Sequence, residues 1–247
     1  MAEKKNPLAL DLSHWDPADD YDAVRREGYV GIIFKATEGQ SYTDDTYTQQ
    51  QRAAKQAGLC WGSYHFADAS DVLGQIENYM RFAAPDPDEL FCLDWEDNPT
   101  GNGRMSVDDA KIWIREVERR LNRPGQCVIY SGNTAKEQIH GNDPFFGSRR
   151  LWLAHYTDNP TWQQSWDTYW LWQYTETGHV NGVDDACDIN SYKGTADQLR
   201  GEWATGTAGE PAPEPEPVPV VTISIEVPVG VDVQVTINGD ELVTRED

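Results

Sequence analysis

Four acidic residues from three separate parts of the chain could together perform acid–base chemistry. Asp11 lies in one short apolar run, Asp94 and Glu96 end a second, and Asp188 belongs to a third. Asp94 and Glu96 should share one face of a strand, about 6.6 Å apart. Two carboxyls that close repel when both are ionised, so one should keep its proton near neutral pH. A protonated acid beside a carboxylate is what cleavage of a glycosidic bond requires.

Aromatic residues near the ends of the apolar runs could hold a sugar against these carboxylates. Sugars present C–H faces that stack on aromatic rings, and the polar atoms of Tyr and Trp reach hydroxyl groups. Trp95 has the wrong parity for this role and should pack in the core. Any single ring could also be an ordinary core residue. The rings that we expect to contact substrate are Tyr64, Phe66, Tyr130, Tyr156 and Trp172.

Short apolar runs alternate with helical segments, and these elements must position the candidate residues. The predicted strands are 8–15, 30–36, 60–66, 89–95, 126–131, 151–156, 169–174 and 184–190. The predicted helices are 21–28, 45–58, 72–84, 106–123, 134–140 and 195–203. Within 106–123, apolar residues recur at spacings of three and four on one face, and Ser106 is placed to cap the first turn.

This alternation predicts an α/β fold, a parallel TIM-like barrel. The segments 157–168 and 175–183 are short and polar, so the last strands should lack full helices, with room for antiparallel pairing. The active site of such a barrel lies at the C-terminal ends of its strands, where all four acidic residues are expected. One such carboxylate could be a strand-end residue bonded to backbone. The set of four favours a site.

The net charge of −22, from 42 acidic and 20 basic residues, argues against nucleic acid as a partner. It also argues against charge-driven binding to an anionic membrane or wall polymer. No apolar run approaches the roughly 20 residues that span a bilayer, so we expect no membrane insertion. Residues 1–7 lack the apolar segment of a secretory signal. We therefore expect synthesis in the cytoplasm and action on an extracellular target after release.

The cysteines and histidines do not form a recognisable metal site. Cys60, Cys92, Cys127 and Cys187 are far apart, and no Cys-x-x-Cys pair occurs. We expect all four to be reduced thiols, on grounds of compartment. The five histidines are scattered along the chain. We expect neither a metal nor a cofactor.

The composition changes after the predicted barrel, which we assign to residues 1–204. Residues 205–219 are rich in Pro and Glu and read as a linker. In 220–247, the odd positions from Val221 to Ile237 are all apolar, which predicts a small β module with one apolar face. So small a unit cannot shield that face alone, so it must dock on the barrel, bind the wall or pair with copies from other chains. We favour the last of these, a homo-oligomer formed through free strand edges.

Seven short segments, in this order, resemble glycoside hydrolase family 25, the Chalaropsis-type lysozymes common among bacteriophage endolysins. They cover residues 7 to about 203, and none is decisive alone. The segments are Asp11-Leu-Ser-His-Trp, Phe34-Lys-Ala-Thr-Glu-Gly39, Gly62-Ser-Tyr-His-Phe66, Leu93-Asp-Trp-Glu96, Leu151-Trp-Leu-Ala-His-Tyr156, Trp172-Gln-Tyr-Thr175 and Asp188-Ile-Asn190.

The resemblance implies a (β/α)5(β)3 barrel and a muramidase that cleaves peptidoglycan between N-acetylmuramic acid and N-acetylglucosamine. Glu96 matches the general acid of the family and Asp94 its partner carboxylate, acting either as nucleophile or by positioning the acetamido group of the substrate. Asp11 and Asp188 match acidic residues that line the site, and Lys35 and Glu38 fall in a matching segment. Asp16 departs from the Gln often found there.

Two other functions are consistent with the residues. A barrel glycosidase of this kind could act on chitin-like polymers, and analysis of the released products would separate the two substrates. A non-catalytic sugar-binding module of a phage particle is the second alternative. The presence of both Asp94 and Glu96 argues against it, because a binding module needs no proton donor.

Overall fold

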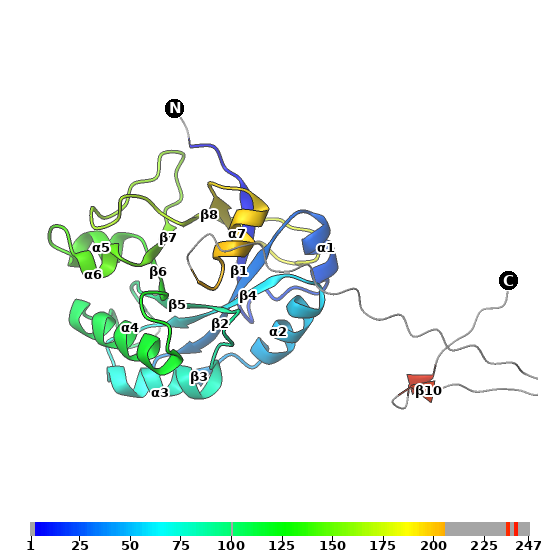
Figure 1. Ribbon diagram of the computed structural model, residues 1–247, viewed down its shortest axis with the longest axis horizontal. Helices are drawn as coiled ribbons and strands as arrows, with labels where there is room; N and C mark the ends of the chain where they lie inside the picture. The colour runs from blue at the N-terminus through cyan, green and yellow to red at the C-terminus, as the bar shows by residue number, and fades with distance from the viewer. Residues whose placement is uncertain (1–2, 100, 206–235, 238–239, 242–247) are drawn as a thin grey trace, which may run out of the picture. The chain divides into compact units, whose positions relative to one another are not determined.

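Eight strands of the computed structural model close into a barrel (Figure 1), in the order β1-β9-β8-β7-β6-β5-β4-β2, with β2 pairing back onto β1. The structure describes residues 3–99, 101–205, 236–237 and 240–241. The barrel strands are β1 (Pro7–Leu12), β2 (Gly31–Glu38), β4 (Cys60–Phe66), β5 (Leu90–Asp94), β6 (Val128–Ser131), β7 (Arg150–Ala154), β8 (Leu171–Gly178) and β9 (Cys187–Tyr192). A two-residue strand, β3 (Tyr42–Thr43), pairs with β2. The predicted barrel fold is confirmed.

From β1 through β2, β4, β5, β6 and β7 to β8, successive barrel strands run parallel to one another. Strand β9 is antiparallel to both β8 and β1. The helices are α1 (Tyr21–Arg26), α2 (Tyr47–Gln56), α3 (Val72–Phe82), α4 (Val107–Leu121), α5 (Asn133–Gln138), α6 (Pro144–Gly147) and α7 (Ala196–Glu202). No helix occurs between β7 and β8 or between β8 and β9, all of whose residues are described. The (β/α)5(β)3 pattern and the antiparallel end are therefore confirmed.

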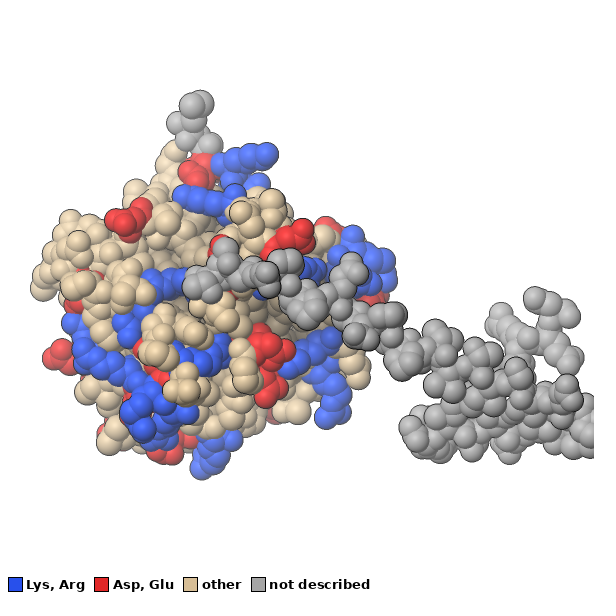
Figure 2. All heavy atoms as spheres, viewed as in Figure 1, with Lys and Arg blue, Asp and Glu red and all other residues tan. Residues whose placement is uncertain are grey.

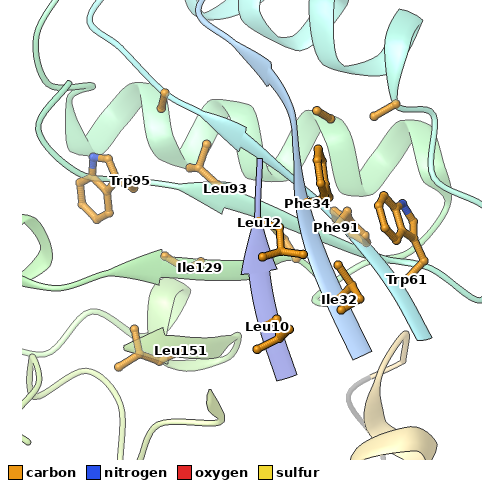
Figure 3. Packing of buried hydrophobic residues seen from close by; sticks show 14 of the residues in the cluster. Leu10, Leu12, Ile32, Phe34, Trp61, Phe91, Leu93, Trp95, Ile129 and Leu151 are labelled. Carbon is orange, nitrogen blue, oxygen red and sulfur yellow. The ribbon is translucent and has the colours of Figure 1, made fainter. Parts of the chain in front are cut away.

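Side chains alternate between two cores because successive strand residues face opposite sides of the sheet. The outer core lies between the strands and the helices, and Figure 3 shows Leu10, Ile32, Trp61 and Leu93 on this side. The inner core fills the barrel itself with residues of the opposite parity, among them Ala9, Ile33, Cys92 and Trp152. Trp95 is fully buried and stacks on Phe146 in the outer core, as its parity predicts.

Local hydrogen bonds explain where the elements begin and end. Ser106 caps α4 by accepting a bond from the backbone N–H of Asp109, as the sequence predicts. Strand β1 is shorter than predicted: it ends at Leu12 because the Asp16 carboxylate accepts bonds from the N–H and hydroxyl of Ser13 and folds 13–16 into a turn. The short helix α6 was not predicted. Its sequence is only four residues long and begins with Pro144.

Helix α7 closes the end of the barrel where the parallel strands begin. The Trp203 indole lies against Gly31, the first residue of β2, and leaves no room there for a Cβ atom. Its Nε1–H donates to the Trp61 carbonyl at 2.7 Å. Arg150, the first residue of β7, donates to the carbonyls of Glu202 and Trp203 at 2.7 and 3.1 Å. These bonds satisfy carbonyls at the end of α7 that the helix leaves unpaired.

The described residues also show the state of the cysteines, the lengths of the apolar helices and the distribution of surface charge. All four cysteines are free thiols. No helix in the described ranges is long and apolar enough to cross a membrane. On the face shown in Figure 2, Lys and Arg side chains lie among Asp and Glu side chains, so the acidic surplus does not form a uniform coat.

The chain divides into two compact units, residues 1–212 and 213–247. Of the second, the structure describes only the antiparallel pairing of β10 (Thr236–Ile237) with β11 (Asp240–Glu241). The predicted linker and most of the predicted β module lie outside the described residues. The proposed boundaries at 204/205 and 219/220 therefore stay predictions.

We predict that Trp203→Ala lowers the free energy of unfolding by about 3–5 kcal/mol, because it removes a buried indole and leaves a cavity. Leu73→Ala on α3 is the control: this leucine is 57% exposed, so the change should be within about 0.5 kcal/mol. Urea denaturation followed by circular dichroism measures both. Equal midpoints for the two variants would contradict the importance of the α7 closure.

Candidate active site

The barrel brings Asp11, Asp94 and Asp188 to one end from three strands. Asp11 lies near the end of β1, and Asp94 is the last residue of β5. Asp188 is the second residue of β9, so the expectation that it lies towards the C-terminal end of its strand is wrong. It reaches the same mouth because β9 runs antiparallel, which places its start beside Asp11, its register partner.

Glu96 lies two residues past Asp94, beyond the end of β5. The four acidic residues line one small pocket of about 80 Å³. The other lining residues are Tyr64, Tyr130, Trp152 and Gln173. Above it lies an open cleft of about 980 Å³, whose walls include Lys35, Glu38, Phe66 and Tyr156. Glu96 and Tyr130 line both the pocket and the cleft.

Asp94 and Glu96 form an electrostatically coupled pair. Burial raises the pKa of Asp94 well above its usual range, and the charge of Glu96 raises it further. Its Oδ1 is buried and has no hydrogen-bond partner in the described part of the chain. Burial, together with the charges of Asp188 and Asp97, raises the pKa of Glu96 to about 7. The pair therefore holds at least one proton into the neutral range.

Lys35 supplies the positive charge next to this pair. Its Nζ donates to Glu38 Oε2 at 2.6 Å and lies 4.9 Å from the centre of the Phe66 ring. Asn98 donates to the other Glu38 oxygen at 3.0 Å. The charge of Lys35 lowers the pKa of both Asp94 and Glu96, in opposition to burial.

Asp11 and Asp188 form a second acidic pair beneath the cleft. Gln173 Nε2 donates to both oxygens of Asp11, at 2.8 and 3.0 Å, and to Asp188 Oδ2 at 3.1 Å. Asn190 Nδ2 donates to Asp11 Oδ2 at 2.7 Å. A hydrogen bond also joins the two carboxyls, and burial raises the pKa of Asp11 to about 7 and that of Asp188 to about 9. At neutral pH this pair holds a proton, mainly on Asp188.

The predicted aromatic contacts divide between the site and the core. Tyr130, Phe66 and Tyr156 line the cleft, and Tyr64 lines the pocket. Trp172 belongs to neither, which corrects our expectation. It is fully buried in the outer core, and its Nε1–H donates to the His155 carbonyl at 2.7 Å. The alternation along β8 turns Trp172 outwards and its neighbour Gln173 into the barrel.

Sequence reasoning missed Gln173 and Asn190, and strand parity could have found both. Asn190 lies two residues after Asp188 and so shares its face. Trp15, the last residue of the Asp11-Leu-Ser-His-Trp segment, also lines the cleft, with 77% of its surface exposed and its ring 4.5 Å from that of His14. A turn and not a strand carries it.

Within the described residues, one group of three side chains has metal-ligand spacing, namely Asp86, Asp88 and Glu89. It does not line the cleft or the pocket. The Nζ of Lys55 lies 2.7 Å from Glu89 and 3.5 Å from Asp86, so a cation of the chain already offsets part of the charge of this cluster. The groups that the mouth offers for chemistry are its four carboxyls, the groups that glycoside hydrolases use.

Comparison with known proteins places this barrel in a family. The profile of glycosyl hydrolases family 25 matches residues 10–183. Lysozyme M1 of Streptomyces globisporus is 29% identical over 216 residues, which span 80% of this chain and 71% of that protein. The N,O-diacetylmuramidase of Arthroderma benhamiae is 25% identical and covers 77% of this chain and 84% of its own length.

Solved structures agree. The bacterial lysozyme from Streptomyces coelicolor superposes with a TM-score of 0.72 at 27% identity, over 83% of this chain and all of that one. The muramidase from Acremonium alcalophilum gives a TM-score of 0.68 at 28% identity, over 81% and 99%. The chain belongs to glycosyl hydrolase family 25 and is a lysozyme, or muramidase, that acts on peptidoglycan.

We predict opposite changes in the pKa of Asp94 in two variants. Glu96→Gln removes a like charge and should lower it, whereas Lys35→Met removes a cation and should raise it. Titration of ¹³C-labelled Asp side chains by NMR, with Asp94→Asn to assign the signal, measures both. An Asp94 signal that titrates identically in the two variants would contradict the coupling.

Proposed function

We propose that the enzyme hydrolyses the β-1,4 bond between N-acetylmuramic acid and N-acetylglucosamine, with Glu96 as general acid and Asp94 as its partner carboxylate. The position of Glu96 carries this assignment: it lines both the open cleft and the buried pocket, whereas Asp94 lines only the pocket. A glycan in the cleft therefore meets Glu96 first. A pKa near 7 suits an acid that must hold its proton in the bound complex and release it in the reaction.

The proposed reaction follows from these positions. Glu96 donates its proton to the glycosidic oxygen, the bond from that oxygen to the sugar carbon breaks, and positive charge develops at the carbon. The unpaired Oδ1 of Asp94, once ionised, stabilises that charge. Direct attack by Asp94 and assistance by the acetamido group of the substrate both use this oxygen. Glu96, deprotonated by the first step, then takes a proton from water as the water oxygen bonds to the sugar carbon, and the bond from that carbon to Asp94 or to the acetamido oxygen breaks.

Substrate contacts are proposed for the remaining cleft residues. Phe66 and Tyr156 offer partly exposed aromatic surface, and Tyr156 is 51% exposed. Lys35 and Glu38 present a paired cation and anion on the same wall. Aromatic faces with a few placed polar groups are what recognition of a sugar needs. Asp11 and Asp188 lie below this surface, in the pocket alone.

We predict that Glu96→Gln lowers the rate of wall lysis by at least about 100-fold with the fold intact, because an amide cannot supply the proton. Turbidity of purified walls measures the rate, and circular dichroism checks the fold. Glu77→Gln is the matched control, since this glutamate of α3 is exposed, bonds to Arg120 and lines neither the cleft nor the pocket. Retention of more than about a tenth of the activity by Glu96→Gln would refute its role as the acid.

The biological role that we propose is lysis of a bacterial cell wall by a phage endolysin. Two similarities support it. The CTP1L endolysin superposes with a TM-score of 0.63 at 25% identity, over 76% of this chain and 66% of its own. The lysozyme of Streptococcus phage Cp-9 is 24% identical and covers 70% of this chain and 52% of its own length. Lysis of host cells from within, on expression together with a membrane-permeabilising protein, tests this role.

We also propose that residues 220–247 form a homo-oligomer. The alternating apolar residues from Val221 to Ile237 would expose one apolar face on a module of under 30 residues. Among the described residues, β10 pairs antiparallel with β11, and strands at the edge of a small sheet pair readily with other strands. The nine acidic residues and single basic residue in 207–247 argue against attachment to an anionic wall instead.

We predict that the full chain is oligomeric and that a chain ending at Thr205 is monomeric yet still cleaves soluble glycan fragments. The truncation keeps all the barrel strands, the helices through α7, and Trp203. Light scattering at tens of micromolar measures both masses. A full-length chain that is monomeric under these conditions would refute self-association and favour docking of the module on its own barrel.

A further inference from the structure

Gln173 lies at the centre of the hydrogen bonds beneath the cleft, although it carries no charge and is only 1% exposed. On one side its Nε2 donates to the carboxyls of Asp11 and Asp188. On the other side its Oε1 accepts bonds from the hydroxyls of Tyr130 and Tyr156, both at 2.7 Å. One amide therefore joins side chains from β1, β6, β9 and the loop after β7.

The chemistry of these partners fixes the orientation of the amide. An ionised carboxylate can only accept hydrogen bonds, so the side facing Asp11 must be the NH₂ group. The oxygen then points to Tyr130 and Tyr156, whose hydroxyls can both donate. The reverse orientation would set the amide oxygen against two carboxyls and lose the donor that each needs. Such an unsatisfied buried arrangement is costly.

These bonds decide what Asp11 can do. Its Oδ1 accepts from Gln173, its Oδ2 accepts from Gln173 and Asn190, and it also bonds to the Asp188 carboxyl. With these bonds formed and only 7% of its surface exposed, Asp11 has little capacity left for a sugar. Asp11 then accepts a hydrogen bond from the protonated Asp188 carboxyl. Of the two carboxyls, Asp188 is the one whose charge raises the pKa of Glu96.

We propose that Gln173 is a positioning residue, whose amide, oriented by Tyr130 and Tyr156, holds Asp11 and Asp188 as one proton-sharing pair under the reacting groups. Tyr130 and Tyr156 line the cleft, so the amide also connects the wall that meets the substrate to this buried pair. The inference rests on the proposed function, because the reaction of Glu96 and Asp94 is the reason for holding Asp11 and Asp188 in place beside them.

The proposal predicts a change in the titration of Asp11, which several charged or titratable groups surround. They are Asp16 from the turn after β1, Tyr64, Cys92, Asp94, Tyr130, Tyr156, Cys187 and Asp188. Burial raises the pKa of Asp11, and the hydrogen bonds from Asn190 and Gln173 lower it. Loss of Gln173 should therefore make Asp11 a weaker acid.

The experiment uses the full chain without substrate, so it does not depend on activity. Asp side-chain carboxyls are labelled with ¹³C, the Asp11 signal is assigned with Asp11→Asn, and pH titrations are compared. Gln173→Met, which keeps the volume and removes the bonds, should lower the acid dissociation constant of Asp11 about tenfold. Gln163→Met is the matched control. Gln163 is also buried and donates to the backbone carbonyls of Ile139 and Gly141, away from the cleft.

Gln173→Glu is a second variant for the case in which the methionine variant does not fold. It is nearly isosteric, still accepts from both tyrosines, and replaces the donor with a like charge, so Asp11 should again become a weaker acid. The double variant Tyr130→Phe, Tyr156→Phe frees the amide to rotate. Addition of Gln173→Met to that background should change the Asp11 titration less than it does in the wild type.

Activity then tests the use of the pair in the reaction. In Gln173→Met the acid limb of the pH–rate profile should move to higher pH with the Asp11 titration, and kcat should fall more than KM changes. An Asp11 titration that is unchanged in folded Gln173→Met overturns the proposal. So does an acid limb that stays fixed while the titration moves. A wild-type chain that cleaves no glycan would refute the proposed function, whereas the titration of Asp11 would still decide whether Gln173 positions the pair.

Discussion

The burial of four carboxyl groups at one end of a closed barrel is the constraint on which the rest of the structure depends. Removal of a carboxylate from water is costly, and its like neighbours add repulsion. The structure offsets this cost locally. Lys35 faces one pair, while Gln173 and Asn190 donate to the other. The remaining charge is reduced by proton retention, and a retained proton is what a general acid must have.

The reversed strand β9 makes this gathering possible. A parallel strand presents only its C-terminal end at the mouth and needs a long crossover to return there. As an antiparallel partner of both β8 and β1, β9 presents its start, and Asp188 therefore lies beside Asp11. The direct connection from β8 to β9 without a helix and the placing of Asp188 beside Asp11 thus have one cause.

The two ends of the barrel have different tasks. At the end where the parallel strands begin, Trp203 and Arg150 join α7 to the first residues of β2 and β7 and close the inner core. At the mouth, the inner side chains are polar, and one buried oxygen of Asp94 is unpaired. Stability gained at the closed end offsets the strain of a polar and charged mouth, the usual division in barrels of this class.

The sequence by itself determined the barrel, the strands that carry Asp11, Asp94 and Asp188, and the position of Trp95 in the outer core. These follow from the alternation of apolar runs with helices and from a period of two along a strand, which are local properties of the chain. The segments shared with the family added its reaction, and the family profile confirms it.

The tertiary structure alone decided strand direction and hydrogen-bond partners. Nothing in residues 184–190 says that β9 runs backwards, so Asp188 was expected at the mouth for the wrong reason. Trp172 and Gln173 are neighbours, and the sequence favoured the aromatic ring, yet β8 turns that ring into the outer core. Gln173 became part of the site only when four distant segments converged on its amide. Such long-range contacts depend on closure of the barrel, which no local pattern encodes.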